Sequence, residues 1–198
     1  MQKLYFVLAL FVFLLAPSLT LAESRLSIAI QPLGQFDPKL VEQVKKIILT
    51  TYAIDVIILP AKELPKEAYY QPRNRYRAEK LAVHLSNIDS KTTKILGLTT
   101  KDISTTKGNF ADWGIFGLAL LDRRPAVVST FRIGQASQKL FLERLGKVIN
   151  HEIGHTFGLD HCPNLGCIME DAKGTMKTVD NEKDFCSDCK ARLKGKLK

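Results

Sequence analysis

Residues 151–162 read HEIGHTFGLDHC and lie at the end of a long run of apolar residues with helical spacing that starts near Ser137. His151 and His155 are four positions apart, so on a helix their imidazoles project from one face, one turn apart, and can bind a single metal ion. Glu152 is rotated by about 100° around the helix axis and does not join that ligand set from the same face. The sequence therefore predicts a helix that ends in a metal site, with Glu152 placed to hold a water molecule bound to the ion.

Gly158 and His161 extend this pattern to HExxHxxGxxH. Glycine adopts the left-handed conformation that ends a helix, so the chain can turn sharply and return His161 to the same ion. Three neutral imidazoles leave a coordination position open, which distinguishes a catalytic zinc from a closed structural one. The alternative is that the histidines lie on a helix face and only form hydrogen bonds. This alternative requires that Gly158 and His161 both occupy their positions in the pattern by chance. His84 stands alone in a helical pattern, and we expect a structural or surface role for it.

An ion in such a site lowers the pKa of its bound water toward about 7 and polarises a carbonyl group. A neighbouring carboxylate accepts the proton of the water and later delivers it to the leaving amine. We therefore expect zinc-dependent hydrolysis of a peptide bond by a metal-bound water, with Glu152 as the general base and acid. The substrate would be a protein or a peptide.

All four cysteines of the chain follow directly, as a Cx4C pair and a Cx2C pair separated by 18 residues: Cys162, Cys167, Cys186 and Cys189. This spacing is typical of four thiolates that bind one zinc ion. Such an ion would fold residues 162–198 into a small zinc-bound C-terminal subdomain and help to position His161. The alternative is a pair of disulfides, which an oxidising compartment would favour. The Cx2C pair is poorly spaced to close on itself, so we expect two zinc ions, one catalytic and one structural.

The N-terminus has the features of a secretory signal peptide. Lys3 precedes an apolar run of 13 residues, 4–16, which is short for a membrane span. Thr20 and Ala22 are small residues at the positions that signal peptidase reads. We predict a signal peptide over residues 1–22, cleavage after Ala22, and export to the periplasm or the medium. The alternatives are an N-terminal core helix or an uncleaved anchor.

Residues 23–198 are expected to form one α/β domain. The chain has 198 residues, of which 45% are hydrophobic, so it can bury a core, and neither disorder nor a collagen-like repeat fits. Two apolar runs, 26–30 and 53–59, read as strands on either side of an amphipathic helix that begins at Pro38, a unit that favours a parallel pair. Further elements are expected downstream: a helix at 78–85, strands at 94–99 and 126–131, and an edge strand or bulge within the glycine-interrupted segment 110–121.

The formal charge of +9 biases the surface toward acidic partners. The basic segment 190–198, however, lacks the aromatic residues that single-strand binders place between their cations, so we expect no nucleic-acid partner. We expect this segment to be a solvated, frayed end. We also expect no stable membrane insertion, and a monomer.

These motifs together closely resemble those of the archaemetzincins, a branch of the metzincin zinc peptidases marked by HExxHxxGxxHC, a following Cx4CxM element and a downstream CxxC. Residues 151–162, 162–169 and 186–189 match the three parts. The resemblance implies a metzincin-like α/β fold with a mixed twisted sheet, an active-site helix and a small zinc-bound C-terminal subdomain. It also assigns functional residues: His151, His155 and His161 to the catalytic zinc, Glu152 to the base, Cys162, Cys167, Cys186 and Cys189 to the second zinc, and Met169 to a methionine turn beneath the histidines.

Met176 is a second candidate for the methionine turn, although the order Cys167, Ile168, Met169 favours Met169. The family consists mainly of proteins that are not exported, so the predicted leader is a departure from it. A non-catalytic, zinc-stabilised binding module is the alternative function, but it leaves Glu152 without a role. In the catalytic interpretation, segment 110–121 is the candidate for the edge strand that holds an extended substrate by backbone hydrogen bonds.

Overall fold

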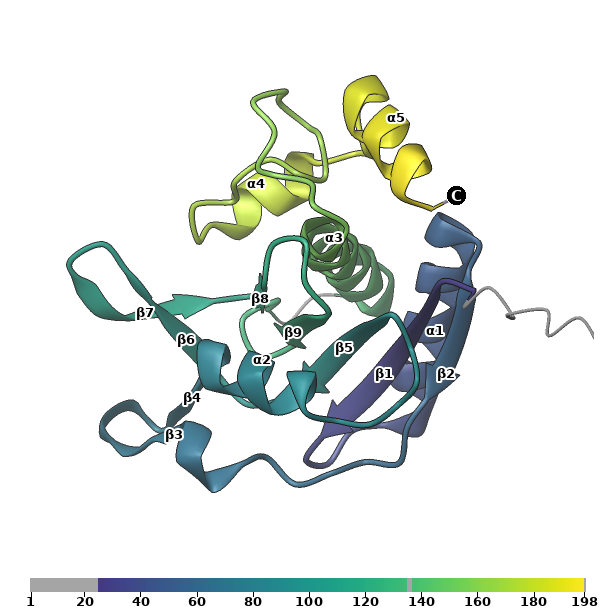
Figure 1. Ribbon diagram of the computed structural model, residues 1–198. Helices are drawn as coiled ribbons and strands as arrows, with labels where there is room; N and C mark the ends of the chain where they lie inside the picture. The colour runs from purple at the N-terminus through teal and green to yellow at the C-terminus, as the bar shows by residue number, and fades with distance from the viewer. Residues whose placement is uncertain (1–24, 135–136, 198) are drawn as a thin grey trace, which may run out of the picture.

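The computed structural model describes residues 25–134 and 137–197 (Figure 1). The signal peptide predicted for residues 1–22 lies outside this range and stays a prediction. Within the described ranges, no helix combines the length and the apolar character that a membrane crossing requires.

The larger of two β-sheets has the strand order β2-β1-β5-β9-β8. Its first four strands run parallel, and β8 pairs with β9 in the antiparallel direction at one edge. The strands are β1 (Ser27–Leu33), β2 (Asp55–Ile58), β5 (Lys94–Thr99), β8 (Gly117–Ala119) and β9 (Pro125–Ser129). The parallel pair predicted for the first sixty residues is confirmed, as are the strand at 94–99 and most of the strand at 126–131, which ends at Ser129. The apolar runs of β1, β5 and β9 are buried on both faces, whereas the edge strand β2 is partly exposed.

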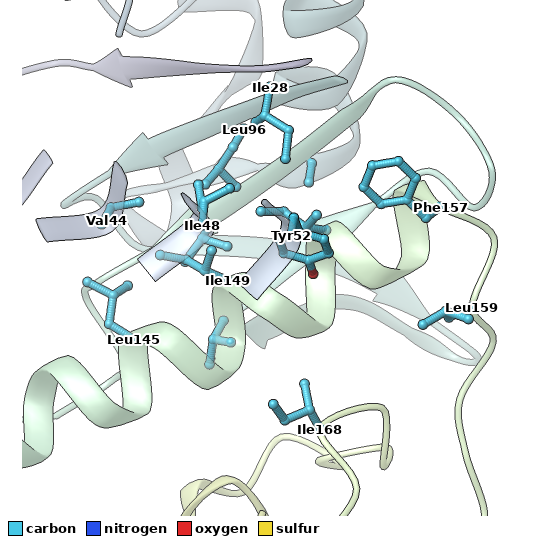
Figure 2. Packing of buried hydrophobic residues seen from close by; sticks show 14 of the residues in the cluster. Ile28, Val44, Ile48, Tyr52, Leu96, Leu145, Ile149, Phe157, Leu159 and Ile168 are labelled. Atoms are coloured by element: carbon cyan, nitrogen blue, oxygen red, sulfur yellow. The ribbon is translucent and has the colours of Figure 1, made fainter. Parts of the chain in front are cut away.

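Helices cover both faces of this sheet. Alternate residues of β1 separate two hydrophobic clusters: Ile28 and Ile30 face one, Ala29 faces the other. α1 (Pro38–Tyr52) and α3 (Gln138–Thr156) pack on the first face, and α2 (Ala78–Ser86) packs on the second. Figure 2 shows side chains of α1 and α3 meeting under the sheet. The two helices are also joined by a hydrogen bond of 3.0 Å from the Tyr52 hydroxyl to the Asn150 carbonyl.

A second sheet of order β3-β4-β6-β7 is absent from the sequence-based expectations. Its strands are short and mostly polar: β3 (Tyr69–Tyr70), β4 (Arg75–Arg77), β6 (Ile103–Lys107) and β7 (Phe110–Ile115), with the 3-10 turns η1 (Lys66–Ala68) and η2 (Gln71–Arg73) beside them. The buried Asp102 carboxylate binds Arg132 at 2.6 Å and Arg75 at 3.1 Å, which ties this sheet to the segment after β9. The second sheet is stabilised by ion pairs between distant residues and by the packing of Ile103 in the cluster under α2. Neither contact is visible as a local apolar pattern in the sequence.

The glycine-interrupted segment 110–121 divides between the two sheets. Its first part is β7, at the edge of the second sheet, and its last part is β8, at the edge of the first. The predicted edge position is therefore confirmed. The predicted bulge also falls in this segment, because between the pairs Thr105–Trp113 and Lys107–Phe110 two residues of β7 lie opposite one residue of β6. Figure 1 shows the β6–β7 hairpin projecting from the body of the molecule.

The expectation of a frayed C-terminal end is wrong. After the short α4 (Met176–Asn181), residues Ser187–Lys196 form α5, which ends beside the C-terminal turn of α1 (Figure 1). Cys189 and Leu193 are four residues apart on one face of α5, and both are buried. This single apolar stripe, together with the cluster of four cysteines, packs α5 against the domain, although the other residues of the helix are mostly charged.

The burial of Leu193 yields a matched pair of substitutions. We expect Leu193→Ala to lower the free energy of unfolding by about 2 to 5 kcal/mol, because the side chain is only 5% exposed and its removal leaves a cavity. Leu165→Ala, at a position 89% exposed, should change it by less than about 0.5 kcal/mol. Urea unfolding of both variants makes the comparison. Equal stabilities would mean that α5 is not packed on the domain.

Candidate metal centre and adjoining cleft

His151 and His155 lie one turn apart on α3, with their Nε2 atoms 3.0 Å from each other. The Nδ1 atom of His151 lies 2.7 Å from the Ile168 carbonyl, and that of His155 lies 2.6 Å from the Leu159 carbonyl. A carbonyl only accepts, so each Nδ1 donates and each Nε2 carries the free lone pair. Two metal-binding lone pairs are thus directed toward one point.

The chain beyond α3 brings the third histidine to this point. Gly158 has φ of +81°, and the Leu159 amide donates to the Gly154 carbonyl at 3.1 Å, so the helix ends in a left-handed turn, as predicted. The His161 ring then lies with its centroid 5.3 Å from that of His151 and 4.9 Å from that of His155. One ring nitrogen of each histidine lies within 4.8 Å of the others, an arrangement that could hold a metal ion. His84 lies on α2, outside this cluster.

The electrostatic surroundings keep the two helical imidazoles neutral. Burial, together with the neighbouring His155, lowers the pKa of His151 to about 3. Burial also lowers the pKa of His155. Neutral imidazole is the form that binds a metal, and three such ligands suit zinc. The three histidines therefore fit the predicted ion in number and type, and the lowered pKa values of His151 and His155 favour the form that binds it.

Glu152 is buried beside these histidines, and burial raises the pKa of its carboxyl group to about 8. The carboxyl group lies against the backbone of β8. A Cβ atom added at Gly117 would lie 2.6 Å from Glu152 Cγ and 2.7 Å from Glu152 Oε1, closer than atoms approach. Only glycine at this position leaves room for the carboxyl group. The sequence shows Gly117 as an interruption of a strand but gives no sign of its neighbour on α3.

Met169 lies beneath α3. It is fully buried, and a Cβ atom added at Gly154 would lie 2.6 Å from its sulfur, so Met169 packs against the helix backbone directly before His155. Its carbonyl accepts a hydrogen bond of 2.7 Å from the Cys162 amide. This placement agrees with the methionine predicted beneath the histidines. Met176 instead begins α4.

The four cysteines converge in a second cluster, although 18 residues separate the two pairs. Their sulfur atoms all lie within 4.8 Å of one another, and Cys162 and Cys186 are 3.7 Å apart. All four are free thiols, and hydrogen bonds from the Cys189 backbone and the Asn164 amide lower the pKa of Cys186. One common point for four sulfur atoms fits a single tetrahedral ion. The cluster joins the loop after α3 to the start of α5.

A cleft of about 200 Å³ opens beside His151, Glu152 and His161. One wall consists of Trp113 and residues 115–118, from the end of β7 into β8, and the other consists of residues 171–174 together with α4. Val148, Val179 and Glu182 line it as well. The wall that contains Trp113 belongs to segment 110–121, which the sequence predicted as the edge strand beside the substrate. Glu182 was not predicted as a cleft residue, because only the tertiary fold brings the end of α4 to this place.

The comparisons with known proteins agree with this architecture. The model of a family described as Peptidase family M54 matches residues 37–195. A curated relative named archaemetzincin, from Methanopyrus kandleri, is 36% identical over 136 residues, which cover 69% of this chain and 75% of the relative. The crystal structure of archaemetzincin from Methanopyrus kandleri superposes with a TM-score of 0.76 at 31% identity, over 90% of this chain and 99% of that one. A zinc-dependent peptidase from Methanocorpusculum labreanum superposes with a TM-score of 0.70 at 26% identity, over 84% and 99%.

These superpositions confirm the predicted fold class, an α/β fold with a mixed twisted sheet and the active-site helix α3. The cysteine cluster near the C-terminus is consistent with the small zinc subdomain that was expected there.

Proposed function

Because this chain belongs to peptidase family M54, and is thereby a zinc metallopeptidase, we propose that it hydrolyses peptide bonds of proteins or peptides in the cleft beside His151. One observation carries the proposal: a buried carboxyl group, Glu152, shares this cleft with three imidazoles that converge on one point. A site built only to stabilise the fold would need neither the cleft nor the carboxyl group.

We assign one zinc ion to the three imidazoles and a second to the four thiolates. The fit of the first set rests on the backbone hydrogen bonds that direct the Nε2 atoms of His151 and His155. When bound there, zinc supplies a Lewis acid that polarises the scissile carbonyl and makes water reactive near neutral pH. The second set supplies no open position and holds the loop after α3 against α5.

Glu152 is the proposed proton carrier. Its pKa of about 8 reflects burial alone, and a cation at the neighbouring imidazoles lowers that pKa because opposite charge favours the carboxylate. The carboxylate oxygen accepts a proton from the attacking water, and the resulting buried carboxylic acid returns it to the nitrogen of the leaving amine. Gly117 keeps the space in which this carboxyl group lies.

The strand β8 is the proposed platform for the substrate backbone. It forms the edge of the larger sheet and shares the cleft wall with the last residues of β7. An extended peptide placed along this edge would pair with backbone groups that have no partner strand among the described residues. This placement brings the peptide across the end of the cleft where His151 and Glu152 lie.

We also propose export, with residues 1–22 as a cleaved signal peptide. The support is the order of Lys3, the apolar run and the small residues at Thr20 and Ala22 in the sequence. An exported peptidase would meet substrates outside the cytosol.

Substitution of Glu152 separates proton transfer from metal binding. We expect Glu152→Gln to keep the zinc content of the parent while kcat/KM for peptide hydrolysis falls by about a hundredfold or more, because the amide cannot accept the proton. Glu143→Gln, an exposed position on the same helix, should retain full activity. Elemental analysis and a fluorogenic peptide assay give the two readings. Parental turnover by Glu152→Gln would eliminate this mechanism.

Gly117→Ala tests the position of the same carboxyl group. The added methyl group overlaps Glu152, so the carboxyl group must move, and we expect kcat/KM to fall by about tenfold to a hundredfold with the zinc content unchanged. Gly195→Ala, where an added Cβ meets open space, is the matched control and should behave as the parent. Undiminished activity in Gly117→Ala would show that Glu152 does not need its place against β8.

A further inference from the structure

The cleft contains a second buried acidic side chain that the proposed reaction does not use. Glu182 follows α4 directly, is 4% exposed, and lines the same cleft as His151 and Glu152. Apolar side chains, including Val148 and Val179, line the cleft together with these acidic groups. The cleft is therefore a mostly apolar space that contains a carboxyl group besides that of the catalytic base.

Glu182 has no ion-pair partner among the residues that the structure describes. The neighbouring cation, Lys147, donates its ammonium group to the carbonyls of Val179 at 2.9 Å and Asp180 at 3.3 Å, at the end of α4. Glu170 adds a further negative charge nearby. Burial raises the pKa of Glu182 to about 8, against a smaller lowering by Lys147. The protein thus buries an acidic group without giving it a full counter-charge.

A ligand could supply that charge. Lysine and arginine side chains have long apolar stems and a cationic end, so their stems suit the valine-lined walls and their ends suit a buried carboxylate. A neutral side chain of equal length would fill the walls but leave the carboxyl group unpaired, which is unfavourable in a desolvated site. The mouth of the cleft, with Lys107, Lys173 and Asp171, carries charges of both signs.

We propose that Glu182 determines substrate specificity by receiving the cationic end of a lysine or arginine side chain next to the scissile bond. This inference rests on the proposed peptidase function and adds the class of side chain that the cleft selects. Glu182 binds the substrate and takes no part in proton transfer.

The test compares peptides that differ only in charge at one position. The peptides are blocked at both ends, and each carries either arginine or its neutral analogue citrulline at one of the two residues that flank the cleaved bond. The arginine side chain is then the only cation of the peptide. For the parent we expect kcat/KM to favour arginine by about tenfold to a hundredfold at one flanking position. In Glu182→Gln this ratio should fall toward one, while the control Glu143→Gln keeps the parental ratio. A parental ratio near one, or a ratio unchanged by Glu182→Gln, overturns the proposal.

One further variant and two control measurements guard against misfolding and a purely structural role. Glu182→Asp keeps the carboxyl group but shortens the side chain by one methylene group. Its kcat/KM ratio of arginine to citrulline peptide should lie between those of the parent and Glu182→Gln. Thermal unfolding and zinc content, measured on each variant, identify any that do not fold. If Glu182→Asp restores no preference over Glu182→Gln when both fold, Glu182 does not bind the cation.

A binding experiment tests the role of Glu182 separately from the proposed peptidase activity. Calorimetry with zinc-loaded Glu152→Gln should show tighter binding of the arginine peptide than of the citrulline peptide, and the additional change Glu182→Gln should abolish the difference. Equal binding of both peptides overturns the role of Glu182 even if the parent cleaves them. Absence of cleavage by the parent refutes the peptidase function and leaves the binding result as the test of Glu182. Discrimination confined to unblocked peptides would assign the carboxyl group to the substrate α-ammonium instead, and would also overturn the proposal.

Discussion

The site depends on two hydrogen bonds, those by which His151 and His155 donate to the carbonyls of Ile168 and Leu159. They fix which ring nitrogen stays available to a metal, and they also join the end of α3 to two loops. Leu159 reaches its place because Gly158 turns the chain with φ of +81°. Ile168 is held from the other side, since its amide donates to the Asp184 carbonyl just before the second cysteine pair. The cysteine cluster therefore supports the histidine cluster through the backbone.

The larger sheet supplies the other half of the cleft. Parallel strands buried on both faces provide a rigid base, on which α3 packs and β8 forms the edge. Edge strand and helix approach so closely that Gly117 leaves room only for the Glu152 carboxyl group. The base, the metal ligands and the proposed substrate platform thus belong to elements that share one hydrophobic core (Figure 2). Such a frame holds reacting groups in position without a rearrangement of the fold.

The sequence predicted the parts of the molecule whose signals are local. Apolar β-branched runs marked the parallel strands, and the spacing of His151, His155 and His161 marked the metal centre, because fixed offsets on a helix and a glycine turn suffice to bring them together. The second sheet was not predicted because its strands are short and mostly polar, and its contacts, such as the ion pair of Asp102 with Arg132 and the packing of Ile103, join residues far apart in the chain. The terminal helix was not predicted for a similar reason. One buried apolar stripe and the cysteine cluster attach it to the domain, although most of its other residues are charged. The roles proposed for Gly117 and Glu182 follow from contacts that only the tertiary structure creates.

A crystal structure of the zinc-loaded protein, with anomalous data at the zinc edge, tests the central claim most directly. The account predicts an anomalous peak about 2.0 to 2.1 Å from one ring nitrogen of each of His151, His155 and His161, with a solvent molecule as a further ligand. It predicts a second peak about 2.3 Å from all four cysteine sulfur atoms. Two results would contradict it: imidazole rings that do not bind a common zinc ion, or a fourth protein ligand on the histidine-bound zinc in place of the solvent molecule.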